Sequence, residues 1–144
     1  MSVTISGSGQ IVKQVISATY ATATTTTSTS FVATGLTASI TPTNSANKIL
    51  VIIGFQQMQT TGGVEALYSA YRNTTNLGGT TKGFGELYNS GNVQSLGGIT
   101  YLDSPATTSA TTYTLYYKSG TGTAIGLNNG DSVSTITLME IAYA

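Results

Sequence analysis

The sequence predicts an all-β fold, an antiparallel β-sandwich of the jelly-roll type. Three observations lead to this prediction. Threonine and valine, which are stiff at χ1 and favoured on a pleated surface, recur along the chain. Turn-forming residues return about every ten positions, a spacing typical of sandwiches and barrels. Helical periodicity is nearly absent, so no crossover helices are expected and the strands should pair antiparallel.

The chain of 144 residues is long enough for one hydrophobic core but not for two. Residues 2–9 read Ser-Val-Thr-Ile-Ser-Gly-Ser-Gly, a composition typical of a flexible or extended segment. We therefore expect an N-terminal arm over residues 1–9 and a single jelly-roll domain over residues 10–144.

The first predicted strand covers residues 11–20. Residues 21–30 are nearly all threonine, alanine and serine, and are either extended or an edge strand. Residues 31–42 form a half-buried strand, because apolar side chains alternate with hydroxyls until a proline ends the segment. The alternating apolar residues are Leu36, Ala38 and Ile40.

Residues 48–57 are the best candidate for a central strand, since residues 49–53 are apolar on both faces. Another strand follows over residues 64–71, after a Gly-Gly turn. Residues 73–98 are rich in glycine and asparagine and carry only short apolar pieces. We expect short strands and long loops in this region.

The C-terminal part predicts strands over residues 99–103 and 111–118. In the second, Tyr113, Leu115 and Tyr117 share one face and Tyr116 lies on the other.

A hairpin turn at residues 119–122 is expected to lead into a strand at residues 123–127. The Asn129-Gly130 pair fits a type I′ turn into a last strand over residues 133–143.

Composition excludes several kinds of function. Charged residues are only 7% of the chain, against roughly 25% in an ordinary soluble domain, and the formal net charge is zero. No basic stripe is available to neutralise phosphates, so no nucleic-acid partner is expected. The longest apolar run, residues 49–55, is too short to cross a bilayer, and no secretory signal is recognised at the N-terminus. We predict a soluble protein with no membrane partner.

The sequence offers few side chains that could catalyse a reaction or bind a metal ion. The chain has no cysteine and no histidine, and its carboxylates are scattered, so we expect no cofactor, no metal and no enzymatic activity. Ser45 and Lys48 match a Ser-x-x-Lys motif only formally, because that motif works at the start of a helix. Residues 128–131 could offer oxygens to calcium, but a hairpin turn is the simpler explanation. Glu65 and Glu86 could meet as a glycosidase pair, but any two acids could meet in space, so the pattern alone does not favour this hypothesis.

Motifs through most of the chain resemble the jelly-roll domains of bacteriophage structural proteins, especially those of marine and cyanobacterial phages. They are Ile11-Val12-Lys13-Gln14-Val15, Ser28-Thr29-Ser30-Phe31-Val32, Gly35-Leu36-Thr37-Ala38-Ser39-Ile40-Thr41-Pro42, Asn47-Lys48-Ile49-Leu50-Val51, Tyr71-Arg72-Asn73, Tyr101-Leu102-Asp103-Ser104-Pro105, Thr111-Thr112-Tyr113 and Ser134-Thr135-Ile136-Thr137-Leu138-Met139-Glu140-Ile141. The resemblance implies a fold like the heads of tumour necrosis factor and complement C1q, and a homotrimer.

The same resemblance implies a place in the virion. Such domains usually end a long tail-fibre chain, whereas here only about ten residues precede the first strand. We therefore expect a capsid decoration (cement) protein on the outer surface of the capsid, with itself and the major capsid protein as partners. The alternative is a receptor-binding tip or small tail-fibre protein that recognises host surface glycan through residues 73–98 and 119–131. A hydrolase is a third, minor hypothesis.

Two sets of residues are the candidates for contacts with partners. Tyrosine supplies a large contact area with a polar tip, so four tyrosines near the C-terminus, together with one leucine, are candidates for the trimer interface. This set is Tyr113, Tyr116, Tyr117, Leu138 and Tyr143. The arm is expected to contact the capsid, where it could add a strand to a sheet edge. This second set is Ser2, Val3, Thr4, Ile5 and Ser6.

Overall fold

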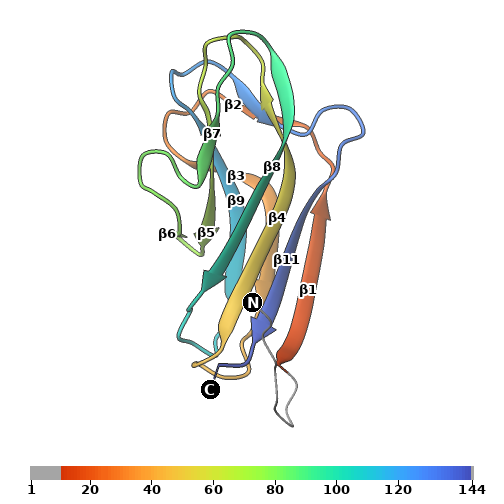
Figure 1. Cartoon of the computed structure of the whole chain (residues 1–144), viewed down its shortest axis with the longest axis vertical. Helices are drawn as coiled ribbons and strands as arrows, with labels where there is room; N and C mark the ends of the chain where they lie inside the picture. The colour runs from red at the N-terminus through yellow and green to blue at the C-terminus, as the bar shows by residue number, and fades with distance from the viewer. Residues whose placement is uncertain (1–10, 144) are drawn as a thin grey trace, which may run out of the picture.

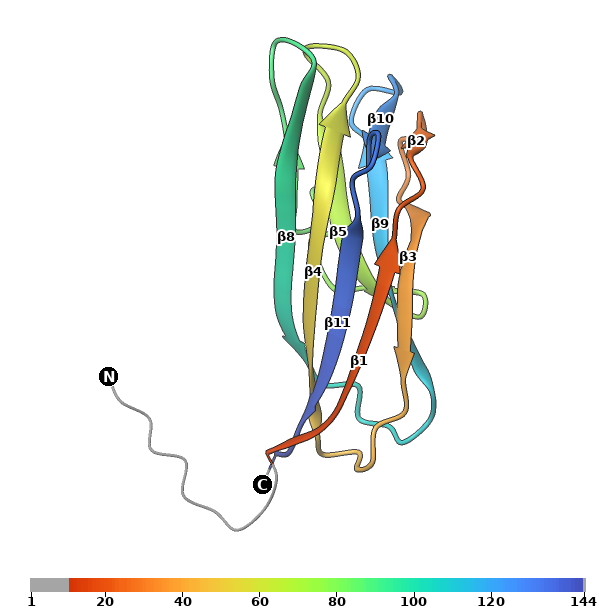
Figure 2. The ribbon, with the colours of Figure 1, turned by 90° about the vertical axis from the view of Figure 1, so that its right-hand side faces the viewer.

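A computed structural model of the chain describes residues 11–143, and this part contains eleven β-strands and no helix. The strands are β1 (Val12–Tyr20), β2 (Thr24–Thr26), β3 (Val32–Ile40), β4 (Lys48–Gln59), β5 (Ala66–Arg72), β6 (Thr75–Asn76), β7 (Gly85–Leu87), β8 (Val93–Asp103), β9 (Thr111–Ser119), β10 (Ile125–Leu127) and β11 (Ser134–Ile141). The strands form two antiparallel sheets packed face to face (Figures 1 and 2). The predicted all-β sandwich is confirmed.

We call the larger sheet A. Its long strands run in the order β1, β11, β4, β8, with β1 and β8 at opposite edges (Figure 2). The short strand β10 pairs with β4 beyond the end of β11, and β2 pairs with β10. Strand β4 therefore has partners on both sides, as the prediction of a central strand requires.

Sheet B has the order β3, β9, β5, and the short strands β6 and β7 pair with the remaining edge of β5. Alternation decides which side chains face the core, because successive residues of a strand point to opposite sides of a sheet. The predicted alternation of β3 is confirmed, since Leu36, Ala38 and Ile40 are buried between exposed neighbours. They face the apolar side chains of β4 and β11, and each fully buried aliphatic side chain contributes roughly 1.5–3 kcal/mol.

The two long sides of the sandwich differ. On one side, the ring of Tyr20 at the end of β1 packs directly against Gly35 of β3, where a Cβ atom would lie 2.7 Å from the ring. Only glycine allows this approach, and Gly35 also has a positive φ of 103°. Sheets A and B are thereby joined along β1 and β3. The opposite side, between β8 and β7, contains a hollow that is described below.

Two predictions about turns are wrong. The turn at residues 119–122 does not make a hairpin, because β9 lies in sheet B whereas β10 lies in sheet A. The Asn129-Gly130 pair does not join a hairpin either, since β10 and β11 both pair with β4 and not with each other. A type I′ turn needs a positive φ at both of its central residues. In the connection between β10 and β11 the residues with positive φ are Asn128 and Gly130, so Asn129-Gly130 does not meet this requirement.

The region predicted as short strands and loops contains one long strand. Strand β8 begins at Val93 rather than at residue 99 and pairs with β4 without interruption to Asp103. Its first half has only two apolar side chains, Val93 and Leu96, and includes Gly97-Gly98, residues that weaken a strand considered alone. Pairing with the apolar strand β4 supplies the hydrogen bonds that hold this half extended.

Candidate interaction surfaces

Three of the residues predicted for a subunit interface lie inside the sandwich. Tyr113 and Leu138 are fully buried, and Tyr117 is nearly so. They face the same core from β9 in sheet B and β11 in sheet A. Because the folded chain already covers them, none of the three can contact a neighbouring subunit, and this part of the prediction is corrected.

The other two predicted residues lie at the surface but on different parts of it. Tyr116 points outward from sheet B, where its ring stacks on Tyr71 with the ring centroids 3.9 Å apart. Burial, and then the neighbouring Tyr116, raise the pKa of the Tyr71 phenol. Tyr143 is 62% exposed after the end of β11, and Lys48 places its ammonium 4.6 Å from the centre of the Tyr143 ring. The structure therefore does not bring the predicted set together on one face.

The predicted capsid-contact residues Ser2, Val3, Thr4, Ile5 and Ser6 lie outside the described residues. Their contact with a capsid protein stays a prediction.

An apolar row crosses the outer face of sheet A. The strand register places Val15 of β1 opposite Met139 of β11, Met139 opposite Leu50 of β4, and Leu50 opposite Leu102 of β8. These four side chains point away from the core, and Ile52 lies two residues along β4 on the same face. We call these five residues the outer apolar row.

The outer apolar row is open to solvent in the single chain. Val15 is 52% exposed, Leu102 is 54% exposed and Ile52 is 39% exposed. Single exposed apolar residues are ordinary, but a contiguous row across four strands is typical of a surface that binds another protein. None of the five positions is charged, so a second apolar surface could cover them without burying an unpaired charge.

The outer face of sheet B is different, because hydroxyl groups pair across its strands. The hydroxyls of Thr37 and Thr114 lie 2.8 Å apart, and those of Ser39 and Thr112 lie 2.7 Å apart. These hydroxyl pairs satisfy one another in water, and the stacked rings of Tyr71 and Tyr116 lie on the same face. The outer face of sheet A therefore presents an apolar row, whereas the outer face of sheet B presents paired hydroxyl groups.

Sequence reasoning did not locate the outer apolar row. Residues 49–53 are apolar at every position, a pattern that predicts burial on both faces of a strand. In the structure Ile49, Val51 and Ile53 are buried, whereas Leu50 is half-buried and Ile52 is exposed. The apolar residues on both faces of this strand were the sequence feature that could have located the row. In the structure they mark an outer face that nothing within the described chain covers.

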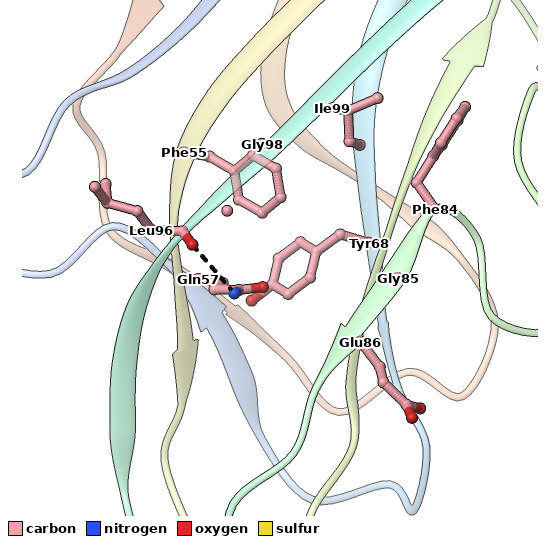
Figure 3. Close-up of a pocket in the computed structure, with 10 residues that line it drawn as sticks. Phe55, Gln57, Tyr68, Phe84, Gly85, Glu86, Leu96, Gly98 and Ile99 are labelled. Carbon is pink, nitrogen blue, oxygen red and sulfur yellow. Dashed lines mark hydrogen bonds between the residues drawn. The ribbon is translucent and has the colours of Figure 1, made fainter.

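A hollow of about 220 Å³ lies between the edge strands of the two sheets, on the side of β8 and β7 (Figure 3). Its walls come from Leu96–Ile99 of β8, from Phe55 and Gln57 of β4, from Tyr68 of β5 and from residues 84–86. The rings of Phe55 and Tyr68 form its floor, with centroids 4.9 Å apart. Burial raises the pKa of Tyr68, whose hydroxyl donates to the carbonyl of Gly126, so this phenol stays neutral.

The structure brings the possible glycosidase pair close together, but around a cation. Lys82 Nζ lies 2.9 Å from Glu65 Oε2 and also pairs with Glu86. The hydrogen bonds that Lys82 donates to Glu86 and Glu65 raise the pKa of Lys82. The two carboxylates thus share one ammonium ion as their partner.

Other chemistry is equally sparse in residues 11–143. No three histidine, cysteine, aspartate or glutamate side chains gather there as a metal site would require. The same residues include no helix long and apolar enough to span a bilayer.

Two carboxylates, those of Asp103 and Glu140, are buried, and each accepts hydrogen bonds from neighbouring side chains. Asp103 accepts from Arg72 Nη1 at 2.9 and 3.0 Å and from the hydroxyl of Tyr113 at 2.7 Å. Burial, and then this bond to Asp103, raise the pKa of Tyr113. Because Arg72, Asp103 and Tyr113 come from β5, β8 and β9, the group ties sheet A to sheet B.

Comparison with models of known protein families and with curated proteins finds no match to this chain. The described residues thus present two candidate surfaces, the outer apolar row and the hollow beside β8.

Proposed function

We propose that the chain is a structural subunit of a bacteriophage virion, a homotrimeric capsid decoration protein that stabilises the head by bridging capsid subunits. One observation carries the self-association: the outer apolar row lies uncovered and uncharged across four strands of sheet A. The resemblance of the sequence to phage jelly-roll domains supports a place in the virion.

The finer fold in this proposal is a jelly roll like the heads of tumour necrosis factor and complement C1q. The strand order supports it. With the short strands β2, β6 and β10 set aside, eight strands remain, in the orders β1-β11-β4-β8 and β3-β9-β5-β7. If these eight are lettered A to H along the chain, the sheets read A-H-C-F and B-G-D-E, an arrangement that two interlocked Greek keys would give.

In the proposed trimer, the outer apolar row of each copy faces the threefold axis. Tyr and Thr side chains of sheet B then face outward, where the hydroxyl pairs keep the particle surface wettable without charge. A neutral surface repels its neighbours weakly, which suits proteins that crowd on a shell.

Binding to purified heads tests the capsid assignment. Heads of the phage that encodes the protein, stripped of decoration protein, should take up hundreds of copies per particle and withstand higher temperature afterwards. The readouts are the copy number by quantitative gel or mass spectrometry and the temperature at which the heads release DNA. Heads that bind none of the purified protein would contradict the proposal.

The alternative function is a receptor-binding tip or small tail-fibre protein for host surface glycan. One observation favours it: Tyr88 is 62% exposed in a loop that also carries Asn89 and Ser90, side chains able to stack on and hydrogen-bond to sugars. Copy number separates the two functions, because a tail protein is present in tens of copies or fewer. Labelling the protein in images of the particle gives the same distinction.

A further inference from the structure

Strand β8 is an unusually open sheet edge. Its residues pair with β4 along the whole strand, and no strand of the described chain pairs with its other side. Natural edge strands are commonly protected by lysine, proline or a bulge. Strand β8 has none of these, and its only charged residue is Asp103 at the end. The opposite edge, β1, carries Lys13 and a bulge between Val12 and Gln14.

The hollow lies directly beside this open edge (Figure 3). At Gly97, a Cβ atom would lie 2.6 Å from the Phe55 ring, so glycine lets the ring lie under β8. At Gly85, across the hollow, a Cβ atom would meet nothing within 4 Å. The side chains of the two sheets therefore leave room between β8 and β7 for groups that the described chain does not supply.

An open edge with a hollow that exposes aromatic rings at its side fits one kind of ligand. A strand added to β8 would form main-chain hydrogen bonds with it, and every second side chain of that strand would point between the sheets. The hollow is lined by the rings of Phe55, Tyr68 and Phe84 and by polar groups that include Gln57 and Glu86, and Glu86 is paired with Lys82. The ligand should therefore be an uncharged extended segment with apolar residues at alternate positions.

We propose that residues 2–6 of a neighbouring copy occupy this edge, with Val3 and Ile5 pointing into the hollow. This segment is uncharged and alternates apolar residues with Ser2, Thr4 and Ser6. The inference rests on the self-association proposed above and gives the segment a partner other than the capsid protein.

The layout of sheet A favours a neighbouring copy over the same chain. Residues 2–6 precede β1, which lies three strand spacings from β8, about 14 Å across the sheet. When the β1 side of one copy lies beside the β8 side of the next, each arm reaches a neighbour. Such head-to-tail contacts close into a ring when the rotation fits, as in a trimer.

Disulfide trapping tests the pairing, because the natural chain has no cysteine. In the added strand, Thr4 would lie on the same side as the outward residues of β8. We expect Thr4→Cys combined with Leu96→Cys, or with Thr100→Cys, to give covalent dimers and trimers on a denaturing gel after mild oxidation. Thr4→Cys combined with Thr37→Cys, on the outer face of sheet B, is the matched control and should stay unlinked. A pattern in which no β8 position links to Thr4 between chains overturns the proposal.

A peptide experiment gives a second, independent readout. A labelled peptide of residues 1–10 should bind the protein that lacks residues 2–9, and the peptide with Val3→Asp and Ile5→Asp should bind at least tenfold more weakly. The peptide with Ser2→Asp and Ser6→Asp keeps both apolar side chains and is the charge-matched control. Equal binding of the two charged peptides contradicts insertion of Val3 and Ile5 into the hollow.

The outcomes also separate this inference from the proposed function. If the protein lacking residues 2–9 stays a trimer, binds no arm peptide and no longer binds heads, the arm belongs to the capsid. The decoration function then stands and the β8 pairing is wrong. If the complete protein neither self-associates nor binds heads, both proposals fail together.

Discussion

The side-chain amide of Asn47 donates to the carboxylate of Glu140 at 2.7 Å, and both residues are buried. Gln14 Nε2, the Thr43 amide and the Thr43 hydroxyl donate to the same carboxylate at 2.7, 2.7 and 2.8 Å. No lysine or arginine of residues 11–143 pairs with it. Four neutral donors thus hold one buried charge, and they join β1, the β3–β4 connection and β11 at one end of the sandwich.

The Glu140 carboxylate makes stability depend on pH. Burial raises the pKa of a carboxyl group, but the hydrogen bonds from Asn47, Gln14 and Thr43 outweigh it and lower the pKa from 4.5 to about 2. Because the folded-state pKa is the lower one, the charged carboxylate stabilises the fold above pH 4.5. This contribution, roughly 3 kcal/mol, is lost as the pH falls from 4.5 towards 2.

Glu140→Gln should therefore cost roughly 2 to 3 kcal/mol at pH 7, since an amide cannot accept from all four donors. The difference from the natural protein should shrink as the pH falls towards 2. Urea unfolding at pH 7, 4 and 2.5 measures it. Glu65→Gln, a change at a partly exposed carboxylate, is the control and should leave stability nearly unchanged. A difference that is the same at every pH would refute this role of Glu140.

Removal of the Asp103 carboxylate should destabilise the junction between the sheets. Asp103→Asn leaves Arg72 without its anion and Tyr113 without its full acceptor, and we expect a loss of roughly 2 to 3 kcal/mol in the free energy of unfolding. Tyr113→Phe should cost about 1 kcal/mol. The matched control is Tyr117→Phe, on the same buried face of β9 and without a carboxylate partner among the described residues. Equal losses for the two phenylalanine variants would show that the Tyr113–Asp103 bond contributes nothing.

Two neighbouring glycines should respond in opposite ways to alanine. Gly83 has a positive φ of 63°, and a Cβ atom there would lie 2.4 Å from the main-chain oxygen of Tyr68. Gly83→Ala should therefore cost about 1 to 3 kcal/mol, because the backbone of β5 cannot yield easily. Gly85→Ala meets nothing within 4 Å and should be tolerated. Thermal unfolding of the two variants compares them directly, and similar melting temperatures would contradict the tight contact at Gly83.

The sequence predicts the strands best where a single strand carries its own side-chain pattern. The hydroxyl and apolar alternation of β3 and the long apolar run of β4 each carry their own signal. The first half of β8 carries none, because Gly97-Gly98 and its polar neighbours are held extended only by β4. The hairpins predicted after β9 and β10 are wrong for a related reason: a turn motif reports local geometry and not which sheet the next strand joins.

The candidate surfaces could not be predicted from the sequence for a similar reason. Tyr113, Tyr117 and Leu138 share the residue types of an interface, and only the packing of the second sheet shows that they are core. The outer apolar row joins Val15, Leu50, Leu102 and Met139 from four strands that are far apart in the chain. Their adjacency depends on strand order and register, which composition and periodicity do not specify.

The mass of the protein in dilute solution tests the central claim, that the outer apolar row is a self-association surface. The natural protein should sediment as a trimer at micromolar concentration. Val15→Lys combined with Leu102→Lys should give a folded monomer, because both side chains are exposed in the single chain and the two charges would be buried in the assembly. Thr37→Lys, on the outer face of sheet B, is the control and should stay a trimer. A natural protein that is a monomer, or a double-lysine variant that remains a trimer, would contradict the claim.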